Sequence, residues 1–265
     1  MEAFYDAKAR EQRTRDERSA SALYPLLQWN NWVKATLIGQ FTAGLGLRVL
    51  DLCGGRGGDL AKWAAARIRS LVLVDISQDS VLEAQRRFDN KANKTFAASF
   101  HHGDAAALDG IAAANGPFDV VSCQFALHYL FDSEERARAT LKGVAARLVR
   151  GGQFLVTIPS AARISAALAE GPVGNVYYSI AAAANGWNFH LGPEVNAFES
   201  PVWRHELIAW ALDVGLAPVL EAVPFPKWRE ERRGLLRHMQ PAAAAMDPKL
   251  EEVFALYDVY VFRKV

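Results

Sequence analysis

Several features are scarce in this chain of 265 residues, and each absence narrows its class. Only two cysteines occur, Cys53 and Cys123, and no spacing of His and Cys suits a metal ion, so we expect neither a disulfide scaffold nor a metal site. No apolar run of transmembrane length and no signal peptide are present, so we expect an intracellular protein without membrane contact. The formal net charge is only +1, so no overall charge imbalance demands nucleic acid.

Apolar residues, by contrast, make up 51% of the chain, which is ample for the core of one large α/β domain. Residues 1–20 are polar and charged and are expected to form a basic N-terminal arm, and residues 21–265 a single domain. Residues 171–200 show little periodicity, and we expect an insertion over the carboxyl edge of the sheet. Elsewhere the pattern predicts helices over 21–41, 81–94, 134–149 (stopped by Gly151-Gly152), 163–169, 202–214 and 228–245, and strands over 49–52, 71–75, 96–104, 118–125, 153–158, 217–223 and 255–263.

The most informative stretch is a glycine cluster between a strand and a helix. An apolar strand runs into the turn Cys53-Gly54-Gly55-Arg56-Gly57-Gly58-Asp59, and an amphipathic helix follows at once. About 20 residues later a second buried strand ends in Asp75. Glycines let backbone N–H groups approach a ligand closely, and a carboxylate at the tip of the next strand is placed to bind a ribose diol. The two features together predict a nucleoside-type cofactor on a doubly wound sheet.

The charges around the turn favour one cofactor over others. Asp51 and Asp59 flank the glycines, which is awkward for a pyrophosphate but suits a cation. S-adenosylmethionine carries an ammonium and a sulfonium and no phosphate. The alternative interpretation is a tight connection in which Asp59 only caps the helix. Because Asp75 follows at the expected spacing, we favour S-adenosylmethionine and methyl transfer.

Two longer motifs extend the interpretation beyond the fold. Before the first strand stands Gln28-Trp29-Asn30-Asn31-Trp32-Val33-Lys34, and the fourth strand ends in Ser122-Cys123-Gln124-Phe125-Ala126-Leu127-His128-Tyr129. They resemble the F-N-N-W-x-K and S-C-Q-F-x-x-H-Y motifs of the mRNA cap guanine-N7 methyltransferases. The turn Thr157-Ile158-Pro159-Ser160 and the strand Leu256-Tyr257-Asp258-Val259-Tyr260-Val261-Phe262 are similar too, so the resemblance spans roughly residues 18 to 263. It implies a Rossmann-like class I methyltransferase: α/β, with a doubly wound, mostly parallel seven-stranded sheet, an antiparallel last strand, and residues 171–200 covering the cap.

The resemblance also implies a role for each matching position. Asp75 would take the ribose hydroxyls, Asp104 the adenine end, and Lys34 the methionine carboxylate. The implied S-adenosylmethionine contacts are Lys34, Cys53, Gly55, Asp59, Asp75, Asp104, Gln124 and Tyr129. The implied cap contacts are Asn30, Asn31, Arg56, Arg87, Phe125, His128, Tyr129, Pro159, Glu199 and Tyr257. Glu199 is assigned by its distance before the Leu207 helix and not by a motif.

The implied substrate is RNA with a 5′ GpppN cap, and other capping enzymes or an activating subunit are candidate partners. The implied location is the nucleus, or the cytoplasm for a viral chain. Guanine N7 carries a lone pair and no proton at neutral pH, so we expect in-line transfer that depends on positioning, with no residue acting as acid or base.

The glycine turn departs from the family pattern. The family turn reads Gly-Cys-Gly-Lys-Gly-Gly-Asp, whereas here Cys53 stands at the first glycine and Arg56 at the lysine. The Cβ of Cys53 is expected to shift the loop or to weaken cofactor binding, and Arg56 keeps the charge while adding a planar fork.

Two alternatives to cap methylation remain open. One is a class I methyltransferase that acts on a small molecule or on another nucleic-acid position. The other is a catalytically silent cap-binding subunit.

Overall fold

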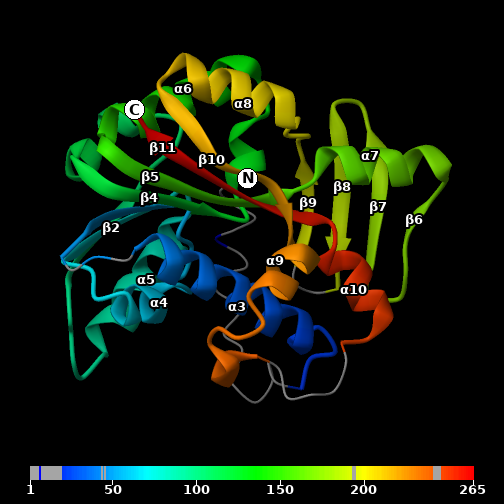
Figure 1. The fold of residues 1–265 in the computed structure, drawn as a ribbon, viewed down its shortest axis with the longest axis horizontal. Helices are drawn as coiled ribbons and strands as arrows, with labels where there is room; N and C mark the ends of the chain where they lie inside the picture. Colours follow the sequence, from blue (N-terminus) through cyan, green and yellow to red (C-terminus); the bar gives the residue numbers. More distant parts are fainter. Residues whose placement is uncertain (1–5, 7–19, 43, 45, 193–194, 241–245) are drawn as a thin grey trace.

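The structure, a computed structural model, describes residue 6 and residues 20–42, 44, 46–192, 195–240 and 246–265 (Figure 1). Most of the predicted arm, residues 1–20, therefore lies outside the described residues. The centre of the described part is a seven-stranded sheet in the order β10-β11-β5-β4-β1-β2-β3. Its strands are β1 (Arg48–Leu52), β2 (Ser70–Asp75), β3 (Ala97–His102), β4 (Phe118–Gln124), β5 (Leu148–Pro159), β10 (Leu216–Pro224) and β11 (Tyr257–Lys264).

The directions of these strands match the doubly wound class. Strand β1 pairs in parallel with β2 and β4, β2 with β3, and β4 with β5. The last strand, β11, lies antiparallel between β5 and β10. The predicted mostly parallel sheet with an antiparallel last strand is confirmed, and it brings the carboxyl ends of β1, β2 and β4 to one edge, where ligands bind in such folds.

Alternate residues of the central strands point to opposite faces of the sheet, and each face has its own core. Val49 and Val120 pack on the face of α3 (Tyr24–Phe41), α4 (Leu60–Ala65) and α5 (Gln78–Asp89). Leu50 and Val121 pack on the other face, under α6 (Glu134–Arg147) and α8 (Arg204–Asp213) (Figure 1). Burial on both faces explains the continuous apolar runs of the predicted strands.

The end of α6 differs from the prediction. The sequence predicts a helix to residue 149 that is stopped by Gly151-Gly152, but α6 ends at Arg147 and β5 begins at Leu148. The two glycines lie inside β5, where its register with β4 shifts between Phe118 and Val120. Gly151 has φ +82°, and a Cβ on Gly152 would stand 2.9 Å from the Val149 carbonyl oxygen. The glycines therefore permit a bulge and do not end the helix.

Residues 171–200 are more regular than predicted. They form a second, antiparallel sheet of β6 (Val173–Gly174), β7 (Tyr178–Ala183), β8 (Gly186–Leu191) and β9 (Val195–Glu199), which stands with α7 (Ala161–Glu170) beside the main sheet (Figure 1). In β8 buried Trp187 and Phe189 alternate with exposed Asn188 and His190. The sequence shows little periodicity here because β7, β8 and β9 are only five or six residues long and their turns interrupt the period of two.

The chain between β10 and β11 contains less helix than predicted. Helix α9 covers Phe225–Glu231 and is followed by a 3-10 turn, η4 (Arg237–Met239), and by α10 (Pro248–Phe254). The end of the helix predicted over 228–245 falls on residues 241–245, outside the described residues. Trp228 fixes α9 on α3, since its Nε1 donates to Thr36 Oγ1 at 2.9 Å. Within the described ranges, none of the helices combines the length and apolar character that crossing a membrane requires.

Candidate active site

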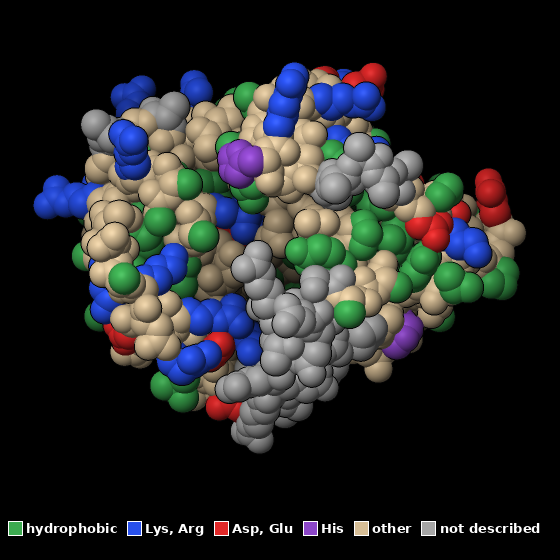
Figure 2. Space-filling view, turned by 90° about the horizontal axis from the view of Figure 1, so that it is seen from below, with side chains coloured by type: hydrophobic (Ala, Val, Ile, Leu, Met, Phe, Trp, Pro, Cys, Tyr) green, Lys and Arg blue, Asp and Glu red, His purple; other side chains and the backbone are tan. Residues whose placement is uncertain are grey.

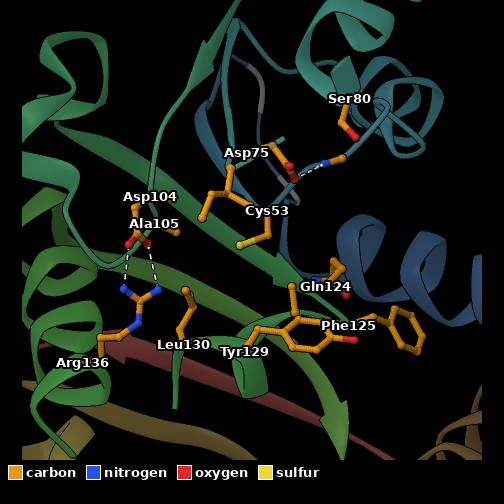
Figure 3. A pocket seen from close by; sticks show the side chains of 13 residues that line it. Cys53, Asp75, Ser80, Asp104, Ala105, Gln124, Phe125, Tyr129, Leu130 and Arg136 are labelled. Atoms are coloured by element: carbon orange, nitrogen blue, oxygen red, sulfur yellow. Dashed lines mark hydrogen bonds and ion pairs between the residues drawn. The ribbon is translucent and has the colours of Figure 1, made fainter. Parts of the chain in front are cut away.

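A pocket lies at the carboxyl ends of β1, β2 and β4 (Figure 3). It contains six of the predicted cofactor contacts: Cys53, Gly55, Asp75, Asp104, Gln124 and Tyr129. The remaining lining residues are Ile76, Ser80, Ala105, Phe125, Ala126, Leu130 and Arg136. The predicted contacts come from four separate segments of the chain, and the parallel sheet brings them together at one edge.

Asp75 is held by two backbone amides at the end of β2. Its Oδ2 accepts from Gly55 N at 2.7 Å and its Oδ1 from Ser77 N at 2.9 Å. Burial raises the pKa of the Asp75 carboxyl, and the bonds from the two amides oppose that rise. Ser77 in turn caps α5 by accepting from Ser80 N, and its hydroxyl donates to Asp6 Oδ1 at 2.6 Å. The carboxylate is therefore fixed in orientation beside the glycine turn.

Asp104 forms a bidentate ion pair across the pocket. Its two carboxylate oxygens accept from Arg136 Nη1 at 2.6 Å and Nη2 at 3.1 Å, and Ala106 N donates to Oδ1 at 2.9 Å (Figure 3). Burial alone would raise the pKa of Asp104, but the Arg136 guanidinium outweighs it and the pKa is lowered. Arg136 was not predicted from the sequence, because it lies in the first turn of α6 and belongs to no motif. Only the fold brings it to the pocket.

A cluster of buried charges supports the glycine turn. Asp59 lies 2.8 Å from Lys34 Nζ and 2.7 Å from Lys62 Nζ, while Asp51 accepts from Trp63 Nε1 at 3.1 Å. Burial, and then the charge of Asp59, raise the pKa of Asp51 to about 7. Burial would also raise the pKa of Asp59, but the two lysines lower it to about 2. The side chain of Asp59 makes no capping bond to α4, so the simple helix-cap interpretation is wrong.

The turn has a left-handed residue at its first position, which is the cysteine. Cys53 has φ +53°, in the left-handed region, and Gly55 and Gly57 follow with φ +53° and +70°. A Cβ on Gly54 would stand 2.6 Å from Leu73 Cγ, so a side chain at this position requires Leu73 to move. At position 53, by contrast, the cysteine side chain extends into the pocket (Figure 3).

The predicted cap contacts form a second cluster that adjoins the pocket. The rings of Phe125 and Tyr257 meet edge to face with centroids 5.1 Å apart, and Tyr257 pairs with Pro159 across β11 and β5. The rings of His128 and Tyr129 lie 4.0 Å apart. Phe125 and Tyr129 also line the pocket, so the two clusters share these aromatic side chains.

Glu199 joins this cluster from the second sheet. Its Oε1 lies 3.5 Å from His128 Nε2, and its Oε2 accepts from Trp187 Nε1 at 3.0 Å. His128 and Glu199 are both almost fully buried. Among the described residues, neither ring nitrogen of His128 has a hydrogen-bond partner. Burial raises the pKa of Tyr257 well above its ordinary value, and the nearby charge of Glu199 adds to the rise.

Four predicted cap contacts lie outside this cluster. Asn31 accepts from Lys62 Nζ at 2.9 Å and lines a second cavity between α3 and η4. Asn30 Oδ1 is buried and has no hydrogen-bond partner among the described residues. Arg56 and Arg87 both approach Glu83 of α5, with closest nitrogen–oxygen distances of 3.8 and 2.7 Å. The structure thus brings the two arginines to one carboxylate but separates Asn31 from the pocket.

The lining of the pocket fits S-adenosylmethionine. Asp75 lines the pocket and is oriented by the amide of Gly55, and a carboxylate at the end of the second strand suits a ribose diol. Ala105 and Leu130 offer apolar surface near Asp104 and suit a purine ring (Figure 3). Because the Arg136 guanidinium is paired with Asp104, the pocket offers little positive charge to a phosphate.

The sheet order, the glycine turn and the acid at the end of β2 define the class I, S-adenosylmethionine-dependent methyltransferase fold. Solved structures agree: the CcbJ methyltransferase of Streptomyces caelestis superposes with a TM-score of 0.63 at 17% identity, with 98% of this chain and 96% of that chain covered. A putative methyltransferase in complex with the Trm112 activator of Haloferax volcanii gives a TM-score of 0.60 at 15% identity, covering 98% and 97%.

Comparison of the sequence with protein families assigns the chain more narrowly than the fold does. The model of the mRNA (guanine-N(7))-methyltransferase domain matches residues 2–188, and the chain belongs to this family. The mRNA cap guanine-N(7) methyltransferase of Candida glabrata is 36% identical over 95% of this chain and 70% of its own length. The mRNA cap guanine-N(7) methyltransferase 1 of Arabidopsis thaliana is 39% identical over 64% of this chain and 49% of its own length. The chain thus spans about half the length of the plant relatives that it matches.

Proposed function

We propose that this protein transfers a methyl group from S-adenosylmethionine to guanine N7 of the 5′ GpppN cap of RNA. The observation that supports the proposal is the junction of the two clusters at Phe125 and Tyr129, since a guanine on the aromatic cluster would lie next to a cofactor in the pocket. When bound, S-adenosylmethionine supplies an activated methyl group on a cationic sulfur. Family membership supports the same reaction.

On this proposal, the residues of the pocket bind and orient the cofactor. Asp75 accepts from the ribose hydroxyls, and Asp104 with Arg136 bounds the adenine end. Lys34 lies beside the turn with Asp59, where its charge favours the methionine carboxylate. Cys53, Gly55 and Gln124 complete the wall of the pocket.

The second cluster holds the guanine. The Glu199 carboxylate accepts from guanine N–H groups, and Phe125 with Tyr257 holds the plane of the base. The ring of buried His128 lies beside the same carboxylate, and its Nδ1, which has no hydrogen-bond partner among the described residues, is proposed as a further contact of the base. Since N7 carries no proton, no side chain has to act as acid or base, and the rate depends on distance and alignment. We infer that residues 21–265 act as one domain in which β6–β9 covers the cap.

Positive surface lies where RNA beyond the cap could run. Lys and Arg side chains gather on the face that lies below the sheet in Figure 1 (Figure 2). Such a surface attracts phosphates without reading sequence. Arg56 of the glycine turn and Arg87 of α5, which both approach Glu83, are the proposed contacts of the triphosphate. Asn30 and Asn31 are further proposed contacts of the capped end. We also propose the nucleus as the place of action, or the cytoplasm for a viral chain, which imaging of the tagged protein tests.

The test is methyl transfer from labelled S-adenosylmethionine to RNA with an unmethylated guanosine cap, with triphosphate RNA as control. Label in 7-methylguanosine from the capped RNA alone supports the proposal. Cofactor binding without transfer points to another acceptor or to a need for an activating subunit. If the protein binds capped RNA but no cofactor, it is a silent cap-binding subunit.

A further inference from the structure

The only two cysteines of the chain meet beneath the cofactor pocket. Cys53 follows the last residue of β1, and Cys123 lies on the neighbouring strand β4, where it pairs with Leu52. Cys53 packs against the core cluster that contains Cys123, the neighbouring thiol raises the pKa of Cys53, and both thiols are free. Adjacent strands therefore place two reducing groups in contact, and no other sulfhydryl of the chain can compete with this pair.

The two thiols differ in access. Cys53 lines the pocket and its sulfur extends into it (Figure 3), whereas Cys123 is fully buried in the core between the sheet and α6. A small oxidant that enters the pocket therefore reaches Cys53 first. Cys123 reacts only with a group already formed on Cys53.

The position of Cys53 is not explained by the fold alone. Its φ of +53° belongs to the left-handed region, which glycine adopts without strain and which other residues occupy at a cost. A glycine at this position would relieve that cost. The residue at this position is instead Cys53, whose thiol lines the pocket and lies beside Cys123.

We propose that Cys53 and Cys123 form a reversible dithiol site, which takes hydrogen peroxide as oxidant and closes to a disulfide that weakens cofactor binding. The effect on binding rests on the proposed function of the pocket; the disulfide itself does not. The Cys53 thiolate attacks one peroxide oxygen, the O–O bond breaks, and hydroxide leaves, which gives a sulfenic acid. The Cys123 sulfur then attacks the Cys53 sulfur, the S–O bond breaks, and water leaves. In sum, two thiols are oxidised and one peroxide is reduced to two waters.

The disulfide alters the turn that carries the cofactor contacts. Bond formation draws the Cys53 sulfur out of the pocket and toward β4. The amide of Gly55, two residues on, donates to Asp75 and follows the displacement of the turn. Loss of one hydrogen bond to a carboxylate corresponds to a decrease in affinity on the order of tenfold or more.

The surroundings of Cys53 set the speed of the first step. The contact with Cys123, burial, and the charges of Asp75 and Asp104 hold the pKa of Cys53 well above its ordinary value. Asp75 faces it from the end of β2, Asp104 from the loop after β3, and Arg136 of α6 brings an opposing charge. The oxidation is therefore slow at neutral pH and rises with pH, by about tenfold per unit below the pKa, because the thiolate reacts.

The experiment treats the whole chain with hydrogen peroxide and measures intact mass, free thiols and S-adenosylmethionine affinity, before and after reduction by dithiothreitol. We expect loss of two hydrogens, loss of both thiols, weaker affinity, and full recovery on reduction. Saturating S-adenosylmethionine should slow the reaction, since it covers Cys53. In Cys123→Ala and Cys123→Ser, each compared with its own reduced state, the reaction should stop at a sulfenic acid on Cys53 that dimedone traps.

Other outcomes overturn the inference. Two free thiols after peroxide, or a persistent sulfenic acid in the unaltered chain, show that no disulfide forms. A disulfide that leaves the affinity unchanged removes the link to the cofactor. If the reduced chain binds no S-adenosylmethionine at all, the proposed function fails, while the mass and thiol measurements still decide whether the dithiol site exists.

Discussion

His128 Nε2 lies 3.5 Å from Glu199 Oε1, and this contact joins the turn after β4 to the last residue of β9. The two residues are 71 positions apart, and only Glu199 belongs to a strand, since His128 lies in the 3-10 turn Leu127–Leu130. Trp187, on the neighbouring strand β8, donates to the other oxygen of the same carboxylate. The second sheet therefore does more than cover the site: it brings one oriented acid to the aromatic cluster.

Glu199→Gln tests this acid. The amide keeps an oxygen for Trp187 Nε1 but removes the negative charge that would face guanine N–H groups. We expect the KM for capped RNA to rise by about 10- to 100-fold, the cost of a hydrogen bond to a charged group, with S-adenosylmethionine affinity unchanged. Steady-state methylation and a cofactor titration check this. Equal loss of affinity for both substrates would mean that Glu199 supports only the fold.

Asp75→Asn tests the ribose contact. The amide retains one acceptor oxygen but cannot accept from Gly55, Ser77 and a diol at once. We expect S-adenosylmethionine affinity to fall by about tenfold or more. Calorimetric titration measures it, with Asp89→Asn as control, because Asp89 is exposed at the end of α5 and its carboxylate lies 2.9 Å from Lys94 Nζ, away from the pocket lining. Unchanged affinity in Asp75→Asn would contradict the assignment.

The pair of Asp104 and Arg136 is suited to a double-mutant cycle. Asp104→Asn and Arg136→Gln each remove a bidentate charge pair that is about one-third exposed, so the coupling energy should be about 1 kcal/mol. Each single variant should also weaken S-adenosylmethionine binding, because Asp104 loses its fixed orientation. Unfolding curves and cofactor titrations of the four proteins supply the two readouts. Additive effects on binding would show that the pair does not act as a unit.

Local patterns were sufficient to predict the sheet and one wall of the pocket. Buried strands leave continuous apolar runs, and their order follows from alternation with helices, so the acid at the end of β2 could be placed from the sequence. Arg136 could not, because its position depends on how α6 packs over β4 and β5. The same holds for the meeting of Cys53 and Cys123, which depends on the pairing of β1 with β4.

The strands of the second sheet could not be predicted from local sequence patterns either. Its strands are short, and polar side chains such as Asn188 and His190 face outward between buried aromatic residues. Cross-strand pairing and contact with the α3 core stabilise them, and neither is visible in a window of sequence. The glycines of β5 illustrate the opposite error, since a helix stop and a strand bulge use the same left-handed residue.

The pH dependence of stability tests the buried Asp51. Its pKa rises on folding from 3.8 to about 7, so between these values the folded protein binds more protons than the unfolded chain. The free energy of unfolding should therefore fall as pH rises from about 4 to about 7. Asp59, with a pKa lowered from 3.8 to about 2, contributes stability that is lost only as pH falls below about 4.

Asp51→Asn removes the first effect and leaves the second. The amide oxygen can still accept from Trp63 Nε1, so the fold is retained. Denaturant unfolding at a series of pH values should show a flatter profile above pH 4 than in the unaltered chain or in Asp89→Asn. A profile that stays as steep in Asp51→Asn would assign the proton uptake to another group.

Gly54→Ala tests the packing beneath the turn. The added Cβ would stand 2.6 Å from Leu73 Cγ and 2.7 Å from its Cδ1, so we expect a loss of about 1–3 kcal/mol in the free energy of unfolding. Leu73→Ala removes both contacting atoms, and in that background the cost of Gly54→Ala should largely disappear. Gly39→Ala is the matched control: it lies in the last turn of α3 and its added Cβ meets nothing within 4 Å, so it should stabilise slightly. An equal cost of Gly54→Ala in both backgrounds would show that backbone conformation, and not Leu73, requires the glycine. Because the steric conflict is local, it also explains why the cysteine of this turn is accommodated at position 53 and not at 54.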